Sequence, residues 1–225
     1  MKHSSFSDYS FVVTAGPTRE WFDPFRYISN PSSGRMGIAF ADAAYSITHN
    51  VTLIHGPVCK EQLSGKKYRM IYAESTSEMR DRVIENLTEG TVLVMAAAPA
   101  DFTPSRRSGT KIKKKDAELT VQLANTPDIL MEAGEHITQN GLTDIIRVGF
   151  AAETDNIYEY AKKKLIEKGL DFICLNDISK EGSGFSSETN EIILYSKNGE
   201  AHHFTKAPKT ELAYRILEKI AEYGG

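Results

Sequence analysis

Short apolar runs that alternate with helical patterns constrain the fold of this chain more than any other feature. The runs of strand length are Phe11–Ala15, Val51–His55, Arg69–Ala73, Thr91–Ala97, Ile145–Phe150, Asp171–Leu175 and Glu191–Tyr195. Helical patterns fall between most of them, over Gly34–Ile47, Ser77–Leu87, Pro127–Ala133, Asn156–Lys168 and Glu211–Glu222. This alternation predicts a Rossmann-like α/β fold, in which helices cover both faces of a mostly parallel sheet.

The last apolar run belongs to a different local motif. Lys197-Asn198-Gly199-Glu200 separates Glu191–Tyr195 from Ala201–Phe204, and Asn-Gly between two such runs favours a tight hairpin turn. We therefore expect a C-terminal antiparallel hairpin. A chain of 225 residues, 40% hydrophobic and 25% charged, suits one globular domain over residues 1–225.

Charge and composition exclude several classes of function. A net charge of −3 and a pI near 6.1 give no general attraction to nucleic acid or anionic membranes. No apolar run is long enough to span a bilayer, and the polar first ten residues contain no export signal, so we expect a cytoplasmic protein. Cys59 and Cys174 lack metal-ligand spacing, and Cys174, within an apolar run, is expected to be a buried, inert thiol.

The loop that precedes the first predicted helix is rich in Ser, Asn and Gly. A strand, such a loop and a helix together direct free backbone N–H groups and the positive end of the helix dipole at one point. We expect Ser32 or Ser33 to cap the helix, and Gly34 and Gly37 to allow close approach of a ligand and a strand. A phosphate-bearing ligand is one occupant of this turn, and an ordinary capped helix is the alternative.

The strand predicted over residues 91–97 ends in alanines and then in Asp101. Small side chains leave room for a ligand against the backbone, and Asp101 can accept a hydrogen bond from a sugar hydroxyl, hold a metal or simply cap the turn. Residues 102–117, which follow, are basic and are predicted to lack strands. They are interpreted as a flap over an anionic substrate, with a solvated surface loop as the alternative.

The helix predicted from Asn156 carries two lysines on its inward face. Ile157, Tyr160, Ala161 and Leu165 mark that face, and Lys164 and Lys168 fall in its middle, one turn apart. Lysines so placed need an anion, such as a triphosphate, or a route to water. In the preceding strand, Phe150 can stack on a base or pack in the core. The residues favour phosphate chemistry with lysines, backbone amides and Mg²⁺.

Together these segments resemble the phosphopantothenate–cysteine ligase (phosphopantothenoylcysteine synthetase) family. The resemblance runs from about Phe11 to Glu222. It is carried by motifs at residues 14–20, 23–24, 26–30 and 32–34, then at 96–98 with 101, 111–114, 125–128, 149–154 and 176–177.

The resemblance implies an activity, a co-substrate and an assembly. The family joins 4′-phosphopantothenate to L-cysteine in coenzyme A biosynthesis, and its bacterial members use CTP through an acyl cytidylate. CTP is therefore the expected co-substrate, with Mg²⁺, and a homodimer with the flap near the partner subunit is implied. Many relatives carry a flavin decarboxylase domain first. Residues 1–9 leave no room for one, so we expect a stand-alone ligase without flavin, and a separate decarboxylase for the next step.

The family's functional residues can be carried over by position. Asn30 is similar to the asparagine that holds the acyl nucleotide, and Lys111 to the flap lysine that neutralises the reacting phosphate. The resemblance assigns nucleotide contacts to Ala97, Ala98, Asp101, Phe150, Lys164 and Lys168. Asn176 is predicted to discriminate the base, and the Ser32-Ser33-Gly34 turn to bind the substrate phosphate; metal ligands stay unassigned. Pro99 and Arg35 depart from the family pattern, in which an aliphatic residue and a lysine are common.

Two other functions stay open on the same fold. One is a dinucleotide-dependent oxidoreductase, against which stands the lack of a Gly-rich fingerprint after the first strand. The other is a nucleotide-binding module without catalysis, which would not require Asn30 or Lys111.

Overall fold

The main element of the structure, a computed structural model that describes residues 6–114, 119–153, 157–177 and 187–223, is an eight-stranded sheet. Six neighbouring strands are parallel: β5 (Arg69–Tyr72), β4 (Val51–His55), β1 (Ser10–Ala15), β6 (Thr91–Met95), β9 (Ile146–Glu153) and β10 (Phe172–Asp177). The antiparallel β11 (Thr189–Ser196) and β12 (Ala201–Pro208) complete the edge next to β10. The predicted parallel sheet and C-terminal hairpin are confirmed.

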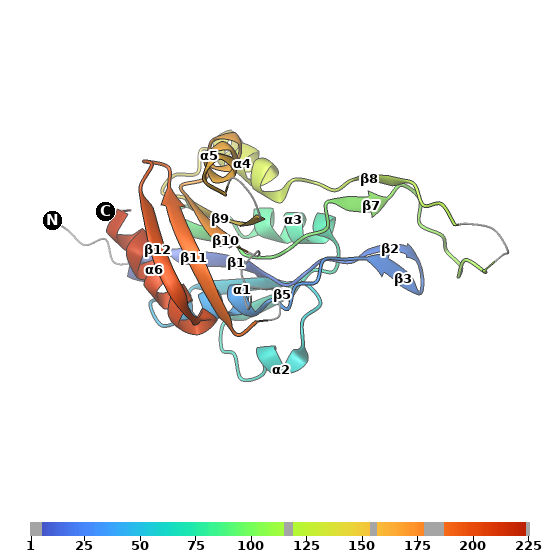
Figure 1. Cartoon of the computed structure of the whole chain (residues 1–225), viewed down its shortest axis with the longest axis horizontal. Coiled ribbons are helices and arrows are strands. Elements are labelled where there is room, and N and C mark those ends of the chain that lie inside the picture. The colour runs from blue at the N-terminus through green and yellow to red at the C-terminus, as the bar shows by residue number, and fades with distance from the viewer. Residues whose placement is uncertain (1–5, 115–118, 154–156, 178–186, 224–225) are drawn as a thin grey trace.

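Helices cover both faces of this sheet (Figure 1). On one face lie α1 (Arg35–Tyr45) and α6 (Lys209–Tyr223), and on the other lie α3 (Thr76–Glu85), α4 (Ile129–Gln139) and α5 (Ile157–Glu167). Successive strand residues serve opposite layers: Val13 packs towards α1, while Val12 belongs to the cluster that contains α3 side chains. Because both faces are buried, the strands read as continuous apolar runs.

The strand order reverses direction at β1. The chain passes from β1 to β4 and β5 on one side, then returns to β6, β9 and β10 on the other. In such sheets a crevice opens beyond the carboxyl ends of the strands at the point of reversal. The fold therefore places a cavity next to the loops that follow β1 and β6.

An arm projects from this end of the sheet (Figure 1). It contains two antiparallel ribbons, β2 (Glu20–Asp23) with β3 (Arg26–Ile28), and β7 (Phe102–Pro104) with β8 (Leu123–Asn125). The prediction that residues 102–117 lack strands is wrong at its start, because Phe102 pairs with Asn125, outside that segment. Lys115 lies outside the described residues.

Smaller differences concern helix lengths. α4 extends to Gln139, six residues beyond the predicted end, and the short α2 (Lys60–Leu63) was not predicted. Among the described residues, no helix combines the length and apolar character that crossing a bilayer requires.

Candidate active site

A cavity of about 700 Å³ opens at the carboxyl end of the parallel strands. Its walls come from the turn before α1, the segment after β6, the segment before α4, the ends of β9 and β10, and one side of α5. All the predicted site residues except Lys111 line it: Asn30, Ser32, Ser33, Gly34, Ala97, Ala98, Asp101, Phe150, Lys164, Lys168 and Asn176. Segments far apart in the chain therefore meet in one cavity.

The turn before α1 differs from the predicted cap. Gly34, in the left-handed region at φ 75°, is the N-cap residue, and no side chain caps the helix. The Ser32 hydroxyl instead accepts a hydrogen bond from the Gly34 amide at 3.4 Å, within the turn. The expectation that Ser32 or Ser33 caps α1 is wrong, because the sharp turn puts a glycine at that position. The start of α1 is thus not closed by a side-chain oxygen.

Glycine at position 37 brings α1 close to the sheet, as predicted. A Cβ atom there would lie 2.3 Å from the Thr14 carbonyl oxygen and 2.7 Å from the Ala15 Cβ. The close approach fixes the start of α1 against the end of β1.

Asn30 connects the α1 turn to the segment after β6. Its side-chain amide donates hydrogen bonds to the Pro99 carbonyl at 2.8 Å and to the Ala98 carbonyl at 3.4 Å. The alanine segment is also hydrogen-bonded to the end of β1. The Ala97 amide donates to the Thr14 hydroxyl, and the Ala98 amide donates to the Gly16 carbonyl. Asn30 therefore shapes one wall of the cavity as well as lining it.

The two inward lysines of α5 lie as the helical pattern predicts. Lys164 and Lys168 are half-buried and face the cavity, whereas Lys162 and Lys163 are exposed. Lys164 donates to the Phe150 carbonyl at 3.4 Å. Lys168 forms an ion pair with Asp128, which also caps α4 by accepting from the Met131 amide at 3.2 Å. The protein itself thus supplies an anion for Lys168, the Asp128 carboxylate. Pattern analysis did not predict this pair.

Phe150 and Asn176 form the part of the cavity at the ends of β9 and β10. The Phe150 ring is half-buried and meets the Phe40 ring edge to face, with centroids 5.5 Å apart. Phe150 packs on the core, as one of the two alternatives expected, and it also lines the cavity, so its stacking on a base stays a prediction. The Asn176 side-chain oxygen is buried and has no hydrogen-bond partner among the residues that the structure describes. A buried acceptor without a donor is costly, so this atom suits a ligand N–H group.

Among the described residues that line the cavity, only Asp101 and Asp128 carry carboxylates. Asp101 is exposed at its edge, and Asp128 is paired with Lys168. The part of the chain that the structure describes contains no cluster of three or more His, Cys, Asp or Glu side chains that could hold a metal ion.

Among the wall residues that pattern analysis missed are two buried polar side chains, Lys209 and Asn190. Lys209 is 6% exposed and Asn190 is 4% exposed, and both line the cavity. Lys209 begins α6 and Asn190 lies in β11, regions assigned only to the hairpin and the last helix. The available signal for Lys209 was its position at the start of a helix, because the helix dipole makes a cation unfavourable there.

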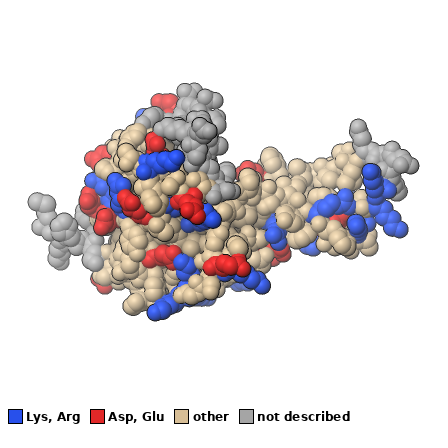
Figure 2. Space-filling model, turned by 60° about the horizontal axis from the view of Figure 1, so that its bottom comes forward, with Lys and Arg blue, Asp and Glu red and all other residues tan. Residues whose placement is uncertain are grey.

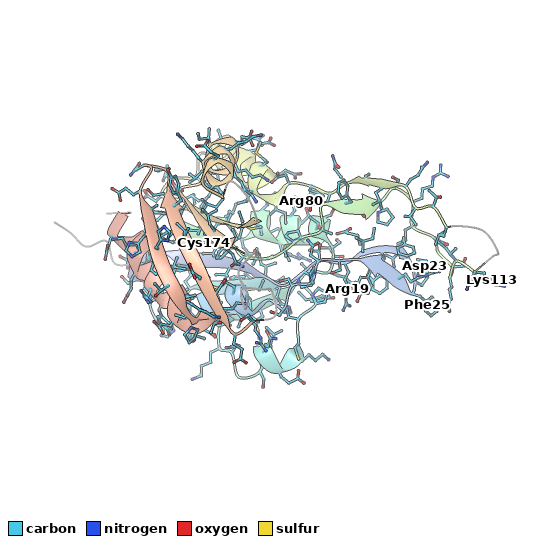
Figure 3. The ribbon with its side chains drawn as sticks, viewed as in Figure 1. Arg19, Asp23, Phe25, Arg80, Lys113 and Cys174 are labelled. Carbon is cyan, nitrogen blue, oxygen red and sulfur yellow. The ribbon has the colours of Figure 1, made fainter. Side chains whose placement is uncertain are left out.

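Lys111 lies outside the cavity, on the arm. Its ammonium group lies 4.8 Å from the centre of the Phe25 ring, which is 63% exposed. Figure 3 shows Phe25 and Asp23 towards the outer end of the arm, with Lys113 close to its tip. Basic side chains gather at this end (Figure 2). Within one chain the arm therefore extends away from the cavity instead of covering it.

Asp23 holds the outer part of the arm together. Its buried carboxylate accepts hydrogen bonds from the Phe25, Arg26 and Ile112 amides and forms a two-pronged ion pair with Arg26. Burial alone would raise the pKa of Asp23, but the hydrogen bonds and the Arg26 charge outweigh it and lower that pKa to about 2. This carboxylate thus links β2 and β3 to the segment that contains Ile112.

Buried threonines join the arm to the cavity wall. The Ala100 amide donates to the Thr18 hydroxyl at 2.9 Å, and the Ala100 carbonyl accepts from Thr126 at 2.6 Å and from Thr76 at 3.3 Å. These bonds fix the residue that precedes Asp101 and β7.

Comparison with known proteins follows from this geometry. Residues 6–223 match the family described as DNA/pantothenate metabolism flavoprotein C-terminal domain. The chain belongs to this family. The resemblance drawn from the sequence motifs is therefore confirmed at the level of the family.

Two relatives and one structure illustrate the relationship. The Coenzyme A biosynthesis bifunctional protein CoaBC of Bacillus subtilis is 40% identical over 93% of this chain and 50% of its own length. A protein of an unknown prokaryotic organism, named Cysteine/Cysteine sulfinic acid decarboxylase, is 42% identical over 92% of this chain and 56% of its own. The crystal structure of the C-terminal domain of a CoaBC protein covers 98% of both chains, with a TM-score of 0.75 and 31% identity. This chain thus spans about half the length of the curated relatives it matches.

Proposed function

We propose that this protein joins 4′-phosphopantothenate to L-cysteine, at the expense of a nucleoside triphosphate, in coenzyme A biosynthesis. One observation carries the proposal: the family's asparagine, alanine, aspartate, phenylalanine and lysine positions, scattered from residue 30 to residue 176, line a single cavity. The similarity to CoaBC proteins, whose name places them in coenzyme A biosynthesis, supports it.

The first step activates the acid. A carboxylate oxygen of 4′-phosphopantothenate attacks the α-phosphorus of CTP, the bond between that phosphorus and the bridging oxygen breaks, and pyrophosphate leaves. Negative charge builds up on the phosphoryl oxygens, so lysines and oriented N–H groups accelerate the step. Lys164 and Lys168 supply charge from α5, and Lys168 exchanges Asp128 for a phosphate oxygen.

The second step forms the amide. The free amine of cysteine attacks the acyl carbonyl, and the amine proton passes to solvent or to the leaving group as CMP departs. Asn30 holds the segment that carries the Ala98 and Pro99 carbonyls and so keeps the acyl group beside the alanine wall. Ser32, Ser33 and Gly34 bind the phosphate of the acid at the start of α1.

Mg²⁺ fits this site as a companion of the triphosphate. Magnesium keeps several waters and takes its remaining oxygens from phosphates and one or two carboxylates. Asp101 is the exposed carboxylate on the cavity wall that can contribute. When bound, the ion supplies neutralisation of the triphosphate charge.

The base pocket favours CTP. Phe150 offers a ring face, and the unpaired Asn176 oxygen accepts the exocyclic amine of cytosine. A uracil carbonyl there would leave two acceptors facing each other. Buried polar groups left unpaired penalise the wrong base.

A homodimer completes the site in this proposal. Lys111 lies on an arm that extends away from its own cavity, so a second copy can receive it. Exposed aromatic side chains along the arm, Phe25, Tyr27 and Phe102, suit contact with another protein surface. The reaction is proposed to take place in the cytoplasm, and decarboxylation of the product is left to a flavin enzyme.

A pyrophosphate-release assay tests the proposal. The protein is given 4′-phosphopantothenate, cysteine, Mg²⁺ and each of CTP, ATP, GTP and UTP, with release of carbon dioxide and turnover of nicotinamide cofactors followed in parallel. The proposal predicts cysteine-dependent ligation with CTP ahead of ATP. Carbon dioxide release without pyrophosphate would favour the decarboxylase named among the relatives, and nucleotide binding without turnover would favour a passive module.

Two variants separate triphosphate from base. Lys164→Ala should lower kcat/KM for CTP and ATP alike, because both carry the same phosphates. Asn176→Ala should instead reduce the preference for CTP over ATP and UTP. A loss confined to CTP in Lys164→Ala would contradict the assignment of that lysine.

A further inference from the structure

The half-buried Arg147 of β9 places its guanidinium group between α4 and the end of α5. A Cβ atom at Gly134, inside α4, would lie 2.6 Å from the Arg147 Nη1 atom. A Cβ atom at Gly169, just after α5, would lie 2.7 Å from the Nη2 atom. The two glycines therefore form a slot that the guanidinium group fills, and a side chain at either position would displace it.

Gly134 is an unfavourable residue for its own helix. It lies in the interior of α4, where glycine stabilises a helix less than alanine does. Local helix propensity therefore does not account for it. The contact with the Arg147 guanidinium group does, because only glycine leaves room for that group against the α4 backbone.

Arg147 also closes the end of α5, which Lys168 directly follows. Gly169 ends the helix in the left-handed region at φ 56°, and the Leu170 amide donates to the Leu165 carbonyl at 2.9 Å. This pattern is a Schellman motif with Lys168 at the C-cap position. The Arg147 Nη1 atom donates to the Lys168 carbonyl at 3.4 Å, at the end of the helix dipole that favours a cation.

The backbone position of Lys168 matters because its side chain faces the cavity. The Lys168 ammonium group pairs with Asp128, and Asp128 caps α4, the helix that contains Gly134. One guanidinium group thus contacts both the helix that begins at Asp128 and the residue that carries the ammonium group. Loss of this group would free the C-cap of α5 to move relative to α4.

We propose that Arg147 is a positioning residue, which sets the place of the Lys168 ammonium group in the cavity and so the affinity for a triphosphate. The inference rests on the proposed function for that role of Lys168. Arg147 is not among the described residues that line the cavity, so it acts through Lys168 and not by touching the phosphates.

Calorimetric binding of CTP, and of inorganic triphosphate as a probe without a base, tests the assignment. Arg147→Met keeps much of the aliphatic stem and removes the guanidinium group, so it should weaken both ligands by about 3–10-fold, as for one hydrogen bond. Lys168→Met should weaken both by about 10–100-fold, because it removes a charged donor. Lys163→Met, which removes an exposed charge from α5, is the control and should match the wild type.

A double variant shows whether Arg147 acts through Lys168. In the Lys168→Met protein, Arg147→Met should weaken binding no further, because the group that it positions is already gone. A direct attraction between Arg147 and the phosphates, or a general loosening of the fold, would persist in that protein. Losses that multiply in the double variant would therefore overturn the inference.

Gly134→Ala gives a second variant, one that favours the α4 helix by propensity. Its Cβ atom would displace the guanidinium group, so it should weaken triphosphate binding as Arg147→Met does and add nothing in the Arg147→Met protein. Glu135→Ala, at the next and exposed position of α4, is the control. Wild-type affinity in either Gly134→Ala or Arg147→Met would contradict the proposed role.

Ligation measured on the same proteins separates this inference from the proposed function. In Arg147→Met the KM for CTP should rise while the KM for 4′-phosphopantothenate stays unchanged, and an equal rise in both would count against positioning. If the wild type performs ligation and Arg147→Met binds triphosphate normally, the inference alone fails. If the wild type performs no ligation, but Arg147→Met weakens triphosphate binding only when Lys168 is present, the proposed function alone fails.

Discussion

The cavity and the arm are ordered in different ways. The cavity is formed by the edge of a sheet whose two faces are buried by helices, and its walls rest on fully buried side chains such as Phe40 and Leu175. The described part of the arm has no such core: Phe25 and Phe102 are 63% and 50% exposed, and hydrogen bonds around Asp23 hold its outer part. Burial of apolar side chains stabilises the sheet and its helices, whereas polar contacts order the described part of the arm. The conformation of the arm can therefore change without unfolding the sheet.

A matched pair of phenylalanine variants gives the largest expected contrast. Phe40→Ala, on the buried face of α1, should lower the free energy of unfolding by about 3–5 kcal/mol, because it removes a buried ring and leaves a cavity. Phe25→Ala, on the arm, should change it by no more than about 0.5 kcal/mol. Chemical denaturation of both variants measures the difference, and a similar loss in both would show that the arm belongs to the core.

Lys111→Ala should affect catalysis and leave stability unchanged. Removal of one well-placed charge from a reacting phosphate costs about 10²–10³ in kcat. Arg106→Ala, which removes another exposed charge from the same arm, is the control. Steady-state kinetics beside a thermal melt is the measurement. Normal turnover of the folded Lys111→Ala variant would mean that the arm is an ordinary solvated loop.

Acid should loosen the arm before it loosens the sheet. The pKa of Asp23 is lowered from 3.8 to about 2, so its ionised form is favoured by the folded arm. The contribution of Asp23 is present above about pH 4 and is lost as the pH falls through 2. The Ile112 amide, which donates to Asp23, reports this change by NMR.

A midpoint for the Ile112 signal near pH 2 is expected, and a midpoint near 3.8 would show that the carboxylate is not held by the arm. Asp23→Asn should remove the titration and increase exchange of this amide at neutral pH, with a normal signal from core amides such as that of Leu93.

The difference between the two regions also explains what the sequence can predict. The central strands of the body are continuous apolar runs and its helices have apolar residues every 3.6 positions, so local patterns locate β4 at Val51–His55 and the inward face of α5. The strands of the arm are only three or four residues long, and side-chain contacts between distant segments hold them together: the Asp23 carboxylate accepts from the Ile112 amide 89 positions away. Such contacts produce no periodic pattern in the local sequence.

Some features of the site escape local patterns for the same reason. Lys209 reaches the cavity only because α6 packs beside α1, and Asp128 meets Lys168 only because α4 and α5 lie on the same face. The Gly34 cap depends on a left-handed backbone, whereas the two preceding serines favour a side-chain cap in the sequence pattern. Family motifs identified Asn30 and Lys111 by position, and the structure adds that one lines the cavity and the other does not.

The central claim is that cavity and arm are parts of one active site that meet only between two copies of the chain. Mixing two inactive variants tests it: Lys111→Ala has an intact cavity, and Asn30→Ala has an intact arm. After subunit exchange, half the dimers are mixed, and each has one complete site if the arm serves its partner, so about a quarter of wild-type ligation should return. Labelled subunits confirm that exchange has occurred. If exchange is complete and the activity stays at the level of the separate variants, the account is contradicted. Lys111 would then have to act in the cavity of its own chain.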